Sequence, residues 1–335
     1  MTRELSYVMP VRWHDDAGLD ELTAYLRGLA REMAEVIVVD RSPEPLFAAH
    51  ARAWEGLVTH LPIDPDVAFV MQKVDGVETG MRRVSHEKVV LADDDVRYGP
   101  AELDAMAAAL DDADLVRPHN FFAPLVWHAR WDTGRTLLNR ALGGDFPGTL
   151  GLRASIYRAM GGYDGDVLFE NLELMRTVAA AGGRVRTRLD LLVARRPPST
   201  RHFLSQRVRQ AYDDFALPLR MAAFLAVGPA VAALIALRRP AGVAALAAGC
   251  VVLAESGRRR GGGARVYPLT GSLLAPAWAL ERGITMWLAV GRRVLSGGVP
   301  YGDRIIRRSA TPVRTLRRRL AQRPPAPAPR PRSAR

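Results

Sequence analysis

Short apolar runs alternate with predicted helices through the first 115 residues. The apolar runs have strand length and lie at Leu5–Val11, Val36–Val39, His60–Ile63 and Lys88–Leu91. Helices are predicted over 18–33, 76–85 and 101–110, and the first is amphipathic, with Leu19, Leu22, Leu26, Leu29 and Met33 at helical spacing. Strands separated by helices of this length predict an α/β fold, with a mostly parallel, Rossmann-like sheet and helices on both faces.

After residue 215 the apolar runs become long. Met221–Leu237 and Ala241–Ala254 contain no charge, and Val266–Leu280 is followed by Glu281-Arg282 and then by apolar Gly283–Gly291. A membrane-spanning helix needs about 20 apolar residues, and the first run just reaches the lower limit. We expect the first two runs to form a hairpin that enters and leaves a membrane, and the third to be an interfacial or partly buried helix. The alternative is that all three are core helices of a soluble α-domain.

Composition adds a charge pattern to this picture. The chain has 335 residues, a formal net charge of +12 and a single cysteine, Cys250, which excludes a disulfide framework and a cysteine-based metal site. Positive charge gathers at the end of the chain together with Pro and Ala, so we expect a basic, mostly disordered tail over 296–335. No helix-turn-helix or base-stacking pattern accompanies this tail, so we expect a membrane partner and no nucleic acid.

The location follows from the same features. The opening residues, MTRELSYVMPV, lack the long apolar segment of a signal peptide and predict a first strand instead. An even number of crossings would keep the basic tail on the same side of the membrane as the N-terminal domain. We therefore expect the protein at the cell membrane, with its N-terminal domain in the cytosol.

Carboxylates stand where two of the predicted strands end. Asp40 follows Val36–Val39, and Asp93, Asp94 and Asp95 follow Lys88–Leu91. In open parallel sheets, ligands bind beyond the carboxyl ends of the strands. Three adjacent carboxylates repel one another, and a divalent cation that prefers oxygen ligands would offset that repulsion. The sequence therefore predicts a Mg²⁺ or Mn²⁺ site here, although a solvated acidic turn is the simpler interpretation of the triplet taken alone.

Four segments in this order are similar to the motifs of inverting family-two glycosyltransferases with the GT-A fold. They are EVIVVDRS, VVLADDDVRYGP, GTLGLRASIYRAMGGYDGDVLFENLELMRTVAAAGGRV and SQRVRQ, and the resemblance covers roughly residues 5–215. Membrane-embedded members of that family carry helices after this region, and the later GGVPYGDR resembles a short motif that follows the last helix in several of them. The resemblance implies a GT-A catalytic domain over 1–215 and membrane-embedded or interfacial helices over 216–295.

The resemblance also implies roles for single residues on the donor side. Asp40 would contact the base or ribose of a nucleotide sugar, with a cap or turn aspartate as the alternative. Asp93 would lie nearer the ribose and contribute to the metal site, and Asp95 would hold the Mg²⁺ or Mn²⁺ that bridges the diphosphate. Lys73 would approach the nucleotide or remain a solvated lysine.

The third motif departs from the family pattern. The family usually shows Glu-Asp, with the Asp as general base, whereas this chain has Glu170-Asn171. An amide takes no proton at neutral pH, so the base role would pass to Glu170 first and Glu173 next, and Asn171 would only contact substrate. The alternative is that Glu170 caps the helix that begins there.

The fourth motif and an aromatic stretch concern the diphosphate and the acceptor. Gln206 and Arg209 match the family's (Gln/Arg)-x-x-Arg, and Arg209 would clamp the diphosphate or else contact anionic lipid. Gln210 replaces the Trp that follows in the family, which favours single transfer over processive synthesis. Trp131 belongs to an aromatic cluster that lies by the acceptor in the family, where a ring would stack on a sugar or a headgroup.

Two hypotheses from different classes result. The first is an inverting glycosyltransferase that uses a nucleotide-diphosphate sugar and a lipid or lipid-linked acceptor. The second is a non-catalytic membrane-bound protein that binds the nucleotide sugar but has lost its base. The substitutions at Asn171 and Gln210 motivate the second hypothesis, whereas Asp40, Asp93 and Asp95 favour the first.

Overall fold

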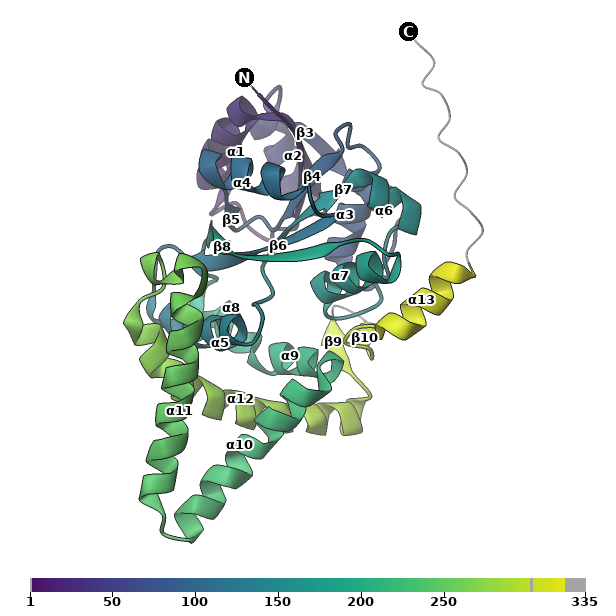
Figure 1. Cartoon of the computed structure of the whole chain (residues 1–335). Coiled ribbons are helices and arrows are strands. Elements are labelled where there is room, and N and C mark those ends of the chain that lie inside the picture. Colours follow the sequence, from purple (N-terminus) through teal and green to yellow (C-terminus); the bar gives the residue numbers. More distant parts are fainter. Residues whose placement is uncertain (1, 302–303, 323–335) are drawn as a thin grey trace.

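The computed structural model describes residues 2–301 and 304–322, and shows a sheet-containing body from which two long helices project (Figure 1). The strands are β1 Arg3–Val11, β2 Met33–Asp40, β3 Thr59–Pro62, β4 Lys88–Ala92, β5 Val96–Arg97, β6 Leu115–Phe122, β7 Thr149–Arg153, β8 Val185–Arg195, β9 Val299–Tyr301 and β10 Arg304–Ile306. The helices of the body are α1 Leu19–Glu32, α2 Glu44–Trp54, α3 Gln72–Met81, α4 Pro100–Ala109, α5 Trp127–Ala141, α6 Ala154–Met160, α7 Glu170–Ala180, α8 Thr200–Ser205 and α9 Arg207–Tyr212. After a 3₁₀ turn at Asp213–Ala216, the later helices are α10 Pro218–Ala236, α11 Pro240–Arg259, α12 Leu269–Ser296 and α13 Val313–Ala321.

Eight strands form one sheet in the order β3-β2-β1-β4-β7-β6-β8-β5. The pairs β3–β2, β2–β1, β1–β4 and β6–β8 are parallel, while β7 runs antiparallel to β4 and β6, and β5 runs antiparallel to β8. The α/β class with helices on both faces is confirmed. The sheet is mixed, because the second half of the domain adds antiparallel strands that no pattern in 116–200 predicted.

Alternation along the strands separates two cores. In β1, Val8 faces the core formed with α3, α6 and α7, whereas Tyr7 and Met9 face the core formed with α1, α2 and α4. All three side chains are fully buried, as expected for a strand covered on both faces. The predicted strands in the first 115 residues are confirmed, and the predicted helices are found with shifted ends, for example α3 at Gln72–Met81 instead of 76–85.

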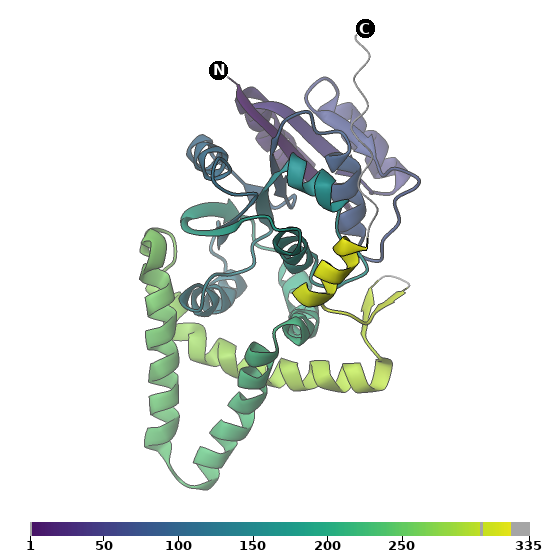
Figure 2. The same cartoon turned by 45° about the vertical axis from the view of Figure 1, so that its right-hand side comes forward.

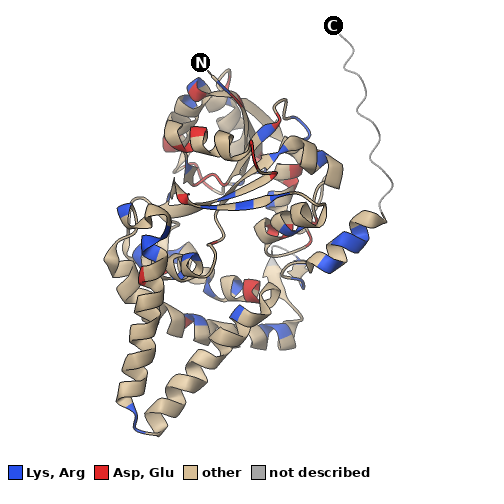
Figure 3. Ribbon diagram, in the orientation of Figure 1, with Lys and Arg blue, Asp and Glu red and all other residues tan. Residues whose placement is uncertain are grey.

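The helices α10 and α11 form an antiparallel hairpin that leaves the body (Figures 1 and 2). Both are long and apolar enough to cross a membrane, and none of α10's apolar window is buried. The hairpin arms carry few charged residues, and Arg238 and Arg239 lie at the tip (Figure 3). Core helices of a soluble domain would be buried, so the exposure of α10 argues against that alternative.

The third apolar run forms α12, which lies across the base of the body and is buried along one face only. Ala275, Trp278 and Met286 are buried, while Leu273 and Ile284 are more than half exposed. The predicted partly buried helix is confirmed. Its buried face contacts α5, α9, α10 and α11, so α12 joins the hairpin to the body.

The chain after α12 returns to the sheet domain and differs from the tail expected over 296–335. The strands β9 and β10 form a hairpin, the amides of Leu168 and Phe169 donate to the carbonyls of Arg308 and Ser309, and α13 packs on α7. Leu316 anchors α13 with 4% exposure. A strand pair and one apolar anchor are enough to fix this basic segment. Residues 323–335 lie outside the described residues.

Candidate functional site

Two cavities meet where the sheet domain approaches the later helices. The acidic cavity, of about 610 Å³, lies beyond the carboxyl ends of β1, β2 and β4 and is lined by Asp93, Asp94, Asp95 and Lys73 among others. The arginine cavity, of about 220 Å³, lies between the sheet domain and α5, α10 and α12. Its cations are five arginines: Arg135, Arg195, Arg209, Arg220 and Arg282. Asp93, Glu170, Arg195 and Arg209 line both cavities, so the two are continuous.

The aspartates that follow β4 are paired with an arginine from β8. Arg195 Nε donates to Asp95 Oδ2 at 2.8 Å, and Arg195 Nη2 lies 3.3 Å from Asp93 Oδ2. The strand register explains this contact, because Val96 pairs with Arg195 and so brings the guanidinium beside the preceding residue, Asp95. Arg195 therefore compensates part of the charge that makes this triplet unusual.

Lys73, at the start of α3, bridges the acidic triplet and α7. Its Nζ is 2.5 Å from Asp93 Oδ1, 2.9 Å from Glu170 Oε1 and 3.5 Å from Asn171 Oδ1. Burial favours the neutral amine, but the charges of Asp93 and Glu170 outweigh it and raise the pKa of Lys73 above its usual range. Of the two interpretations of Lys73, the structure favours the site over a solvated position.

Asp94 and Asp95 are held in different ways. Asp94 accepts a hydrogen bond from the indole of Trp13, and burial together with the charge of Asp95 raises the pKa of Asp94 to about 6. Burial also raises the pKa of Asp95, although Arg195 opposes this. Asp95 Oδ1 is buried and accepts no hydrogen bond.

The residues present fit a divalent cation in part. Asp95 Oδ1 is an orphaned carboxylate oxygen beside Asp93, which matches the one or two carboxylates that Mg²⁺ or Mn²⁺ takes when substrate phosphates complete its shell. Within 2–301 and 304–322, no group of three or more metal-binding side chains is assembled. His202 also lines the acidic cavity, and burial lowers its pKa, which keeps the imidazole neutral and available as a ligand.

Asp40 is placed differently from the expectation. It is 2% exposed and lines neither cavity, and its carboxylate accepts hydrogen bonds from His50 Nδ1 at 2.6 Å, His60 Nε2 at 3.1 Å and the Ser42 amide at 2.7 Å. Burial would raise the pKa of Asp40, but the bonds from His60, Ser42 and His50 lower it to about 2. Both oxygens are thus used inside the protein. The neighbouring Arg41 lines the acidic cavity instead.

The two candidate bases on α7 lie in different surroundings. Glu170 begins α7, lines both cavities and is 12% exposed in its side chain. Asn171 donates to the Pro147 carbonyl at 2.9 Å, which fixes its amide beside Glu170. Glu173 is fully buried, lines neither cavity and accepts the Thr311 amide at 2.5 Å. Glu173 therefore anchors the returning C-terminal segment, and the structure does not bring it to the site.

Of the remaining candidates, Gln206 and Arg209 reach the site and Trp131 does not. Gln206 Oε1 accepts from Arg209 Nη1 at 3.1 Å, and both line the acidic cavity. The indole N–H of Trp131 donates instead to Glu281 of α12, at 2.9 Å. Glu281 also pairs with Arg207, so Trp131 connects α5 to α12. Trp131 therefore serves helix packing rather than the acceptor site, as is common for indoles that find a hydrogen-bond partner inside a protein.

Sequence reasoning missed Arg195, His202 and Asp213. Arg195 is the last residue of β8, and Asp40 and Asp93 were selected because they lie at strand ends too. Arg195 was not selected because no strand was predicted in that region. Asp213 lines the arginine cavity with a buried, unpartnered Oδ1, and burial raises its pKa to about 7 against the opposing effect of Arg209. Its position depends on the 3₁₀ turn before α10, which the local sequence does not mark.

The chain has structural similarity to solved glycosyltransferases, at low sequence identity. No family model matches the sequence, and a search of curated proteins finds no match. Among solved structures, the chain is similar to a mannosyltransferase from Pyrobaculum calidifontis in complex with GDP-Man and Mn²⁺, at 16% identity and a TM-score of 0.49, over 86% of this chain and 88% of that one. It is also similar to glucosyl-3-phosphoglycerate synthase from Mycobacterium tuberculosis with Mg²⁺ and UDP, at 17% identity and a TM-score of 0.41, over 59% and 73%. These scores are too low to carry an argument about function, which rests on the site itself.

Proposed function

We propose that the protein is an inverting GT-A glycosyltransferase that moves a sugar from a nucleotide-diphosphate sugar to a lipid or lipid-linked acceptor, by single transfer, at the cytosolic face of the cell membrane. One observation carries this proposal. Asp93, Asp95, Lys73 and Glu170, which come from three separate parts of the chain, meet at one cavity beyond the carboxyl ends of parallel strands. This is where open α/β sheets bind nucleotides.

On the donor side, the cations of the acidic cavity face the place proposed for the diphosphate. Lys73, Arg195 and Arg209 line that cavity, and charge-assisted hydrogen bonds from such groups stabilise negative charge that develops on a leaving group. Asp93 and Asp95 would hold Mg²⁺ or Mn²⁺, with His202 within the same cavity. When bound, the metal supplies Lewis-acid stabilisation of the leaving diphosphate.

On the acceptor side, Glu170 is the proposed general base. A hydroxyl oxygen of the acceptor forms the new bond to the anomeric carbon as the bond from that carbon to the diphosphate oxygen breaks. The electron pair of the broken bond leaves with the nucleoside diphosphate, and the hydroxyl proton passes to Glu170. Attack opposite to the leaving group inverts the anomeric configuration. Glu170 lines both cavities, so it stands between the proposed donor and acceptor sites.

The membrane part of the proposal rests on the exposed helices. A helix of 19 residues such as α10 is about 28 Å long at 1.5 Å per residue, close to the thickness of a bilayer's hydrocarbon core. The hairpin of α10 and α11 would cross and return, and the exposed apolar face of α12 would lie in the interface. This arrangement would keep the sheet domain at the membrane surface.

The second hypothesis, a non-catalytic binding protein, is favoured by one specific observation. Asn171 stands where the resembled family has its base, its side-chain amide donates to the Pro147 carbonyl, and an amide takes no proton at neutral pH. In that case the acidic cavity would bind the nucleotide sugar without transferring it.

Calorimetric titration of the full chain with UDP and GDP, with and without Mn²⁺, tests the donor site. We expect metal-dependent binding of one nucleotide, and Asp95→Ala should abolish the metal dependence because it removes the orphaned carboxylate oxygen. Asp111→Ala is the matched control and should bind as the unmodified protein does, because this exposed acid pairs with Lys88 at the start of β4, the opposite end of the strand from Asp93. No binding of either nucleotide under any condition would refute the glycosyltransferase proposal.

Turnover separates the enzyme from the binding protein. Release of nucleoside diphosphate from the matching nucleotide sugar, in the presence of membrane lipid extract, should fall about a hundredfold or more in Glu170→Gln. Glu173→Gln is the matched control on the same helix and should retain the rate per folded molecule. Nucleotide binding without any release by the unmodified protein would favour the non-catalytic alternative.

A further inference from the structure

The arginine cavity contains a buried cation that the proposed reaction does not use. Arg282 lies on α12, its side chain is 3% exposed, and its Nε and Nη1 are buried without a hydrogen-bond partner. The nearest carboxylate oxygen, Asp214 Oδ2, is 3.9 Å from Nη1, and the guanidinium lies over the Trp278 ring at 5.0 Å. A buried charge without hydrogen bonds is costly, and a ligand that accepted hydrogen bonds from these nitrogens would offset that cost.

The other cations at this end of the cavity are already compensated. Arg220 pairs with Asp214 and donates to Asn139 at 3.1 Å, and Arg135 is held by two aspartates, one of them Asp145 at 2.7 Å. Asp214 Oδ2 has no hydrogen bond, and Asp213 also lines the cavity with an unpartnered oxygen. Asp214 is the carboxylate that Arg220 and Arg282 share, so its single charge faces two guanidinium groups, while burial raises the pKa of Asp213 to about 7.

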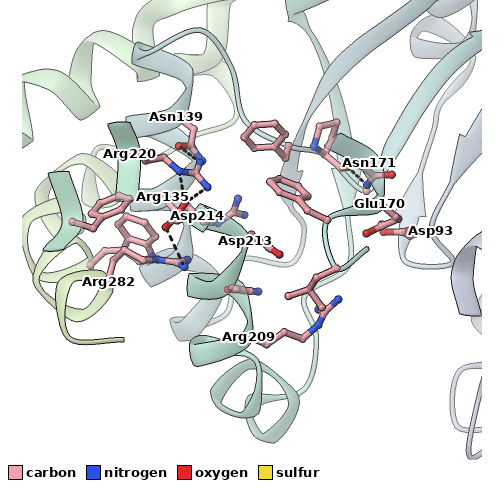
Figure 4. A pocket seen from close by; sticks show the side chains of 18 of the residues that line it. Asp93, Arg135, Asn139, Glu170, Asn171, Arg209, Asp213, Asp214, Arg220 and Arg282 are labelled. Carbon is pink, nitrogen blue, oxygen red and sulfur yellow. Dashed lines mark hydrogen bonds and ion pairs between the residues drawn. The ribbon is translucent and has the colours of Figure 1, made fainter. Parts of the chain in front are cut away.

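The two ends of the cavity differ in chemistry. Figure 4 shows Arg282, Arg220 and Asp214 on one side, and Glu170, Asn171 and Asp93 on the opposite side, with the cavity between them. An acceptor that spans this space would present one group to the arginines and another to Glu170. A guanidinium fork suits the planar arrangement of two phosphate oxygens better than it suits a neutral hydroxyl.

We propose that the acceptor carries a phosphate group that binds to Arg282 and Arg220, while a hydroxyl of the same headgroup reaches Glu170. This inference rests on the proposed transferase function and specifies its acceptor.

An apolar groove on the same helices indicates that the phosphate belongs to a lipid. Phe224 of α10 and Trp278 of α12 line the arginine cavity, and their neighbours Ala223, Ala277 and Ala279 line a groove of about 480 Å³ between α10, α11 and α12. The groove is lined almost entirely by apolar side chains. A headgroup at Arg282 would therefore have its acyl chain beside this groove, within the part of the protein proposed to enter the bilayer.

Three probes that share a glycerol unit separate phosphate from chain. Glycerol phosphate carries the anion alone, monooctanoylglycerol carries the chain alone, and monooctanoylglycerol phosphate carries both. Calorimetric titration of the full chain in phosphatidylcholine nanodiscs should show binding of the third probe, weaker binding of the first and the weakest binding of the second. Equal affinities for the two octanoyl probes would overturn the proposal, because phosphate would then contribute nothing. Equal affinities for the two phosphates would support phosphate recognition and overturn the lipid source.

Substitutions at Arg282 test whether this residue binds the phosphate of the probe. Arg282→Gln should weaken binding of monooctanoylglycerol phosphate about tenfold or more, as expected for a lost charge-assisted hydrogen bond, and Arg282→Lys should lose less. Arg292→Gln, at an exposed position of the same helix, is the matched control and should bind as the unmodified protein does. Unchanged binding in Arg282→Gln would overturn the proposal.

Nucleotide binding distinguishes the failure of this inference from the failure of the proposed function. Titration with the nucleotide and Mn²⁺ should be unchanged in Arg282→Gln, since Arg282 does not line the acidic cavity. Retained nucleotide binding also shows that the variant is folded. Loss of phosphate recognition with intact nucleotide binding is the result expected, whereas nucleotide binding with no phosphate recognition in the unmodified protein refutes this inference and leaves the donor site standing.

Discussion

Replacement of Lys73 is the most direct perturbation of the acidic cavity, because its ammonium group lies between two carboxylates with different proposed roles. Nζ is 2.5 Å from Asp93 Oδ1 and 2.9 Å from Glu170 Oε1, and the side chain is 24% exposed. Lys73→Met keeps a stem of similar length and removes the charge. Both carboxylates then lose their shared cation, and Asp93 keeps only Arg195.

The distances give the expected magnitude. A hydrogen bond to a charged group contributes about 1.5–3 kcal/mol, and removing one partner of a buried ion pair costs about 3–5 kcal/mol. Partial exposure of Lys73 reduces this cost, so we expect the free energy of unfolding to fall by about 2–3 kcal/mol. The freed carboxylates should bind Mn²⁺ more tightly in the absence of nucleotide, by about tenfold or 1.4 kcal/mol. Nucleotide affinity should fall, because a cation facing the diphosphate is gone.

The assay combines denaturant unfolding with calorimetric titration of Mn²⁺ alone and of nucleotide with Mn²⁺. The chain has only one other lysine, Lys88, which starts the strand that Asp93 follows, and whose Nζ is 2.5 Å from Asp111, an acid with 65% side-chain exposure. Lys88→Met is the matched control, and an exposed pair of this kind contributes about 1 kcal/mol or less. If Lys73→Met and Lys88→Met give the same Mn²⁺ affinity and the same loss of stability, the reasoning about the acidic cavity is refuted.

Two further predictions concern stability and the membrane. The pKa of Asp40 is lowered from 3.8 to about 2, so its ionised form contributes about 2 kcal/mol of stability. This contribution is present above pH 4 and is lost as the pH falls towards 2. In Asp40→Asn, the free energy of unfolding should therefore change less between pH 4 and pH 2. Leu246→Arg places a charge on the exposed apolar surface of α11, which costs about 2.5–3.5 kcal/mol at the centre of a bilayer. The substitution should reduce flotation with liposomes and leave nucleotide binding intact. Unchanged flotation would contradict a hairpin that crosses the membrane.

The first half of the sheet could be predicted from sequence because its strands are buried on both faces. Strands of that kind appear as continuous apolar runs, as in Val36–Val39, and α1 carries an apolar stripe of Leu22, Leu26 and Leu29. The second half could not, since β6 and β8 mix polar and apolar residues and are partly exposed at their ends. Their pairing joins residues about 70 apart in sequence, which no local pattern encodes.

The site was predictable as far as it depends on strand ends and helix starts. Asp93 and Glu170 are marked by such positions, and the structure brings them together through Lys73. Glu173 was a prediction from nearness in sequence, but it lies nearly one turn further along α7, where the returning C-terminal segment buries it and the Thr311 amide donates to it. Asp40 shows a different limit, because its partners His50 and His60 lie on other elements and use both carboxylate oxygens.

The break in the third apolar run shows how two adjacent charges serve different purposes. Successive residues of a helix point about 100° apart, so Glu281 and Arg282 face different neighbours. Glu281 pairs with Arg207 and accepts from Trp131, which fastens α12 to the sheet domain. Arg282 has only a long ion pair, at 3.9 Å from Asp214, and its Nε and Nη1 make no hydrogen bond, so an apolar residue at this position of the cavity wall would be less costly in the ligand-free protein. A charged residue that interrupts an apolar pattern without stabilising the fold is expected at a binding site. Arg282 lies between the apolar groove and Glu170, where the headgroup of the acceptor would bind.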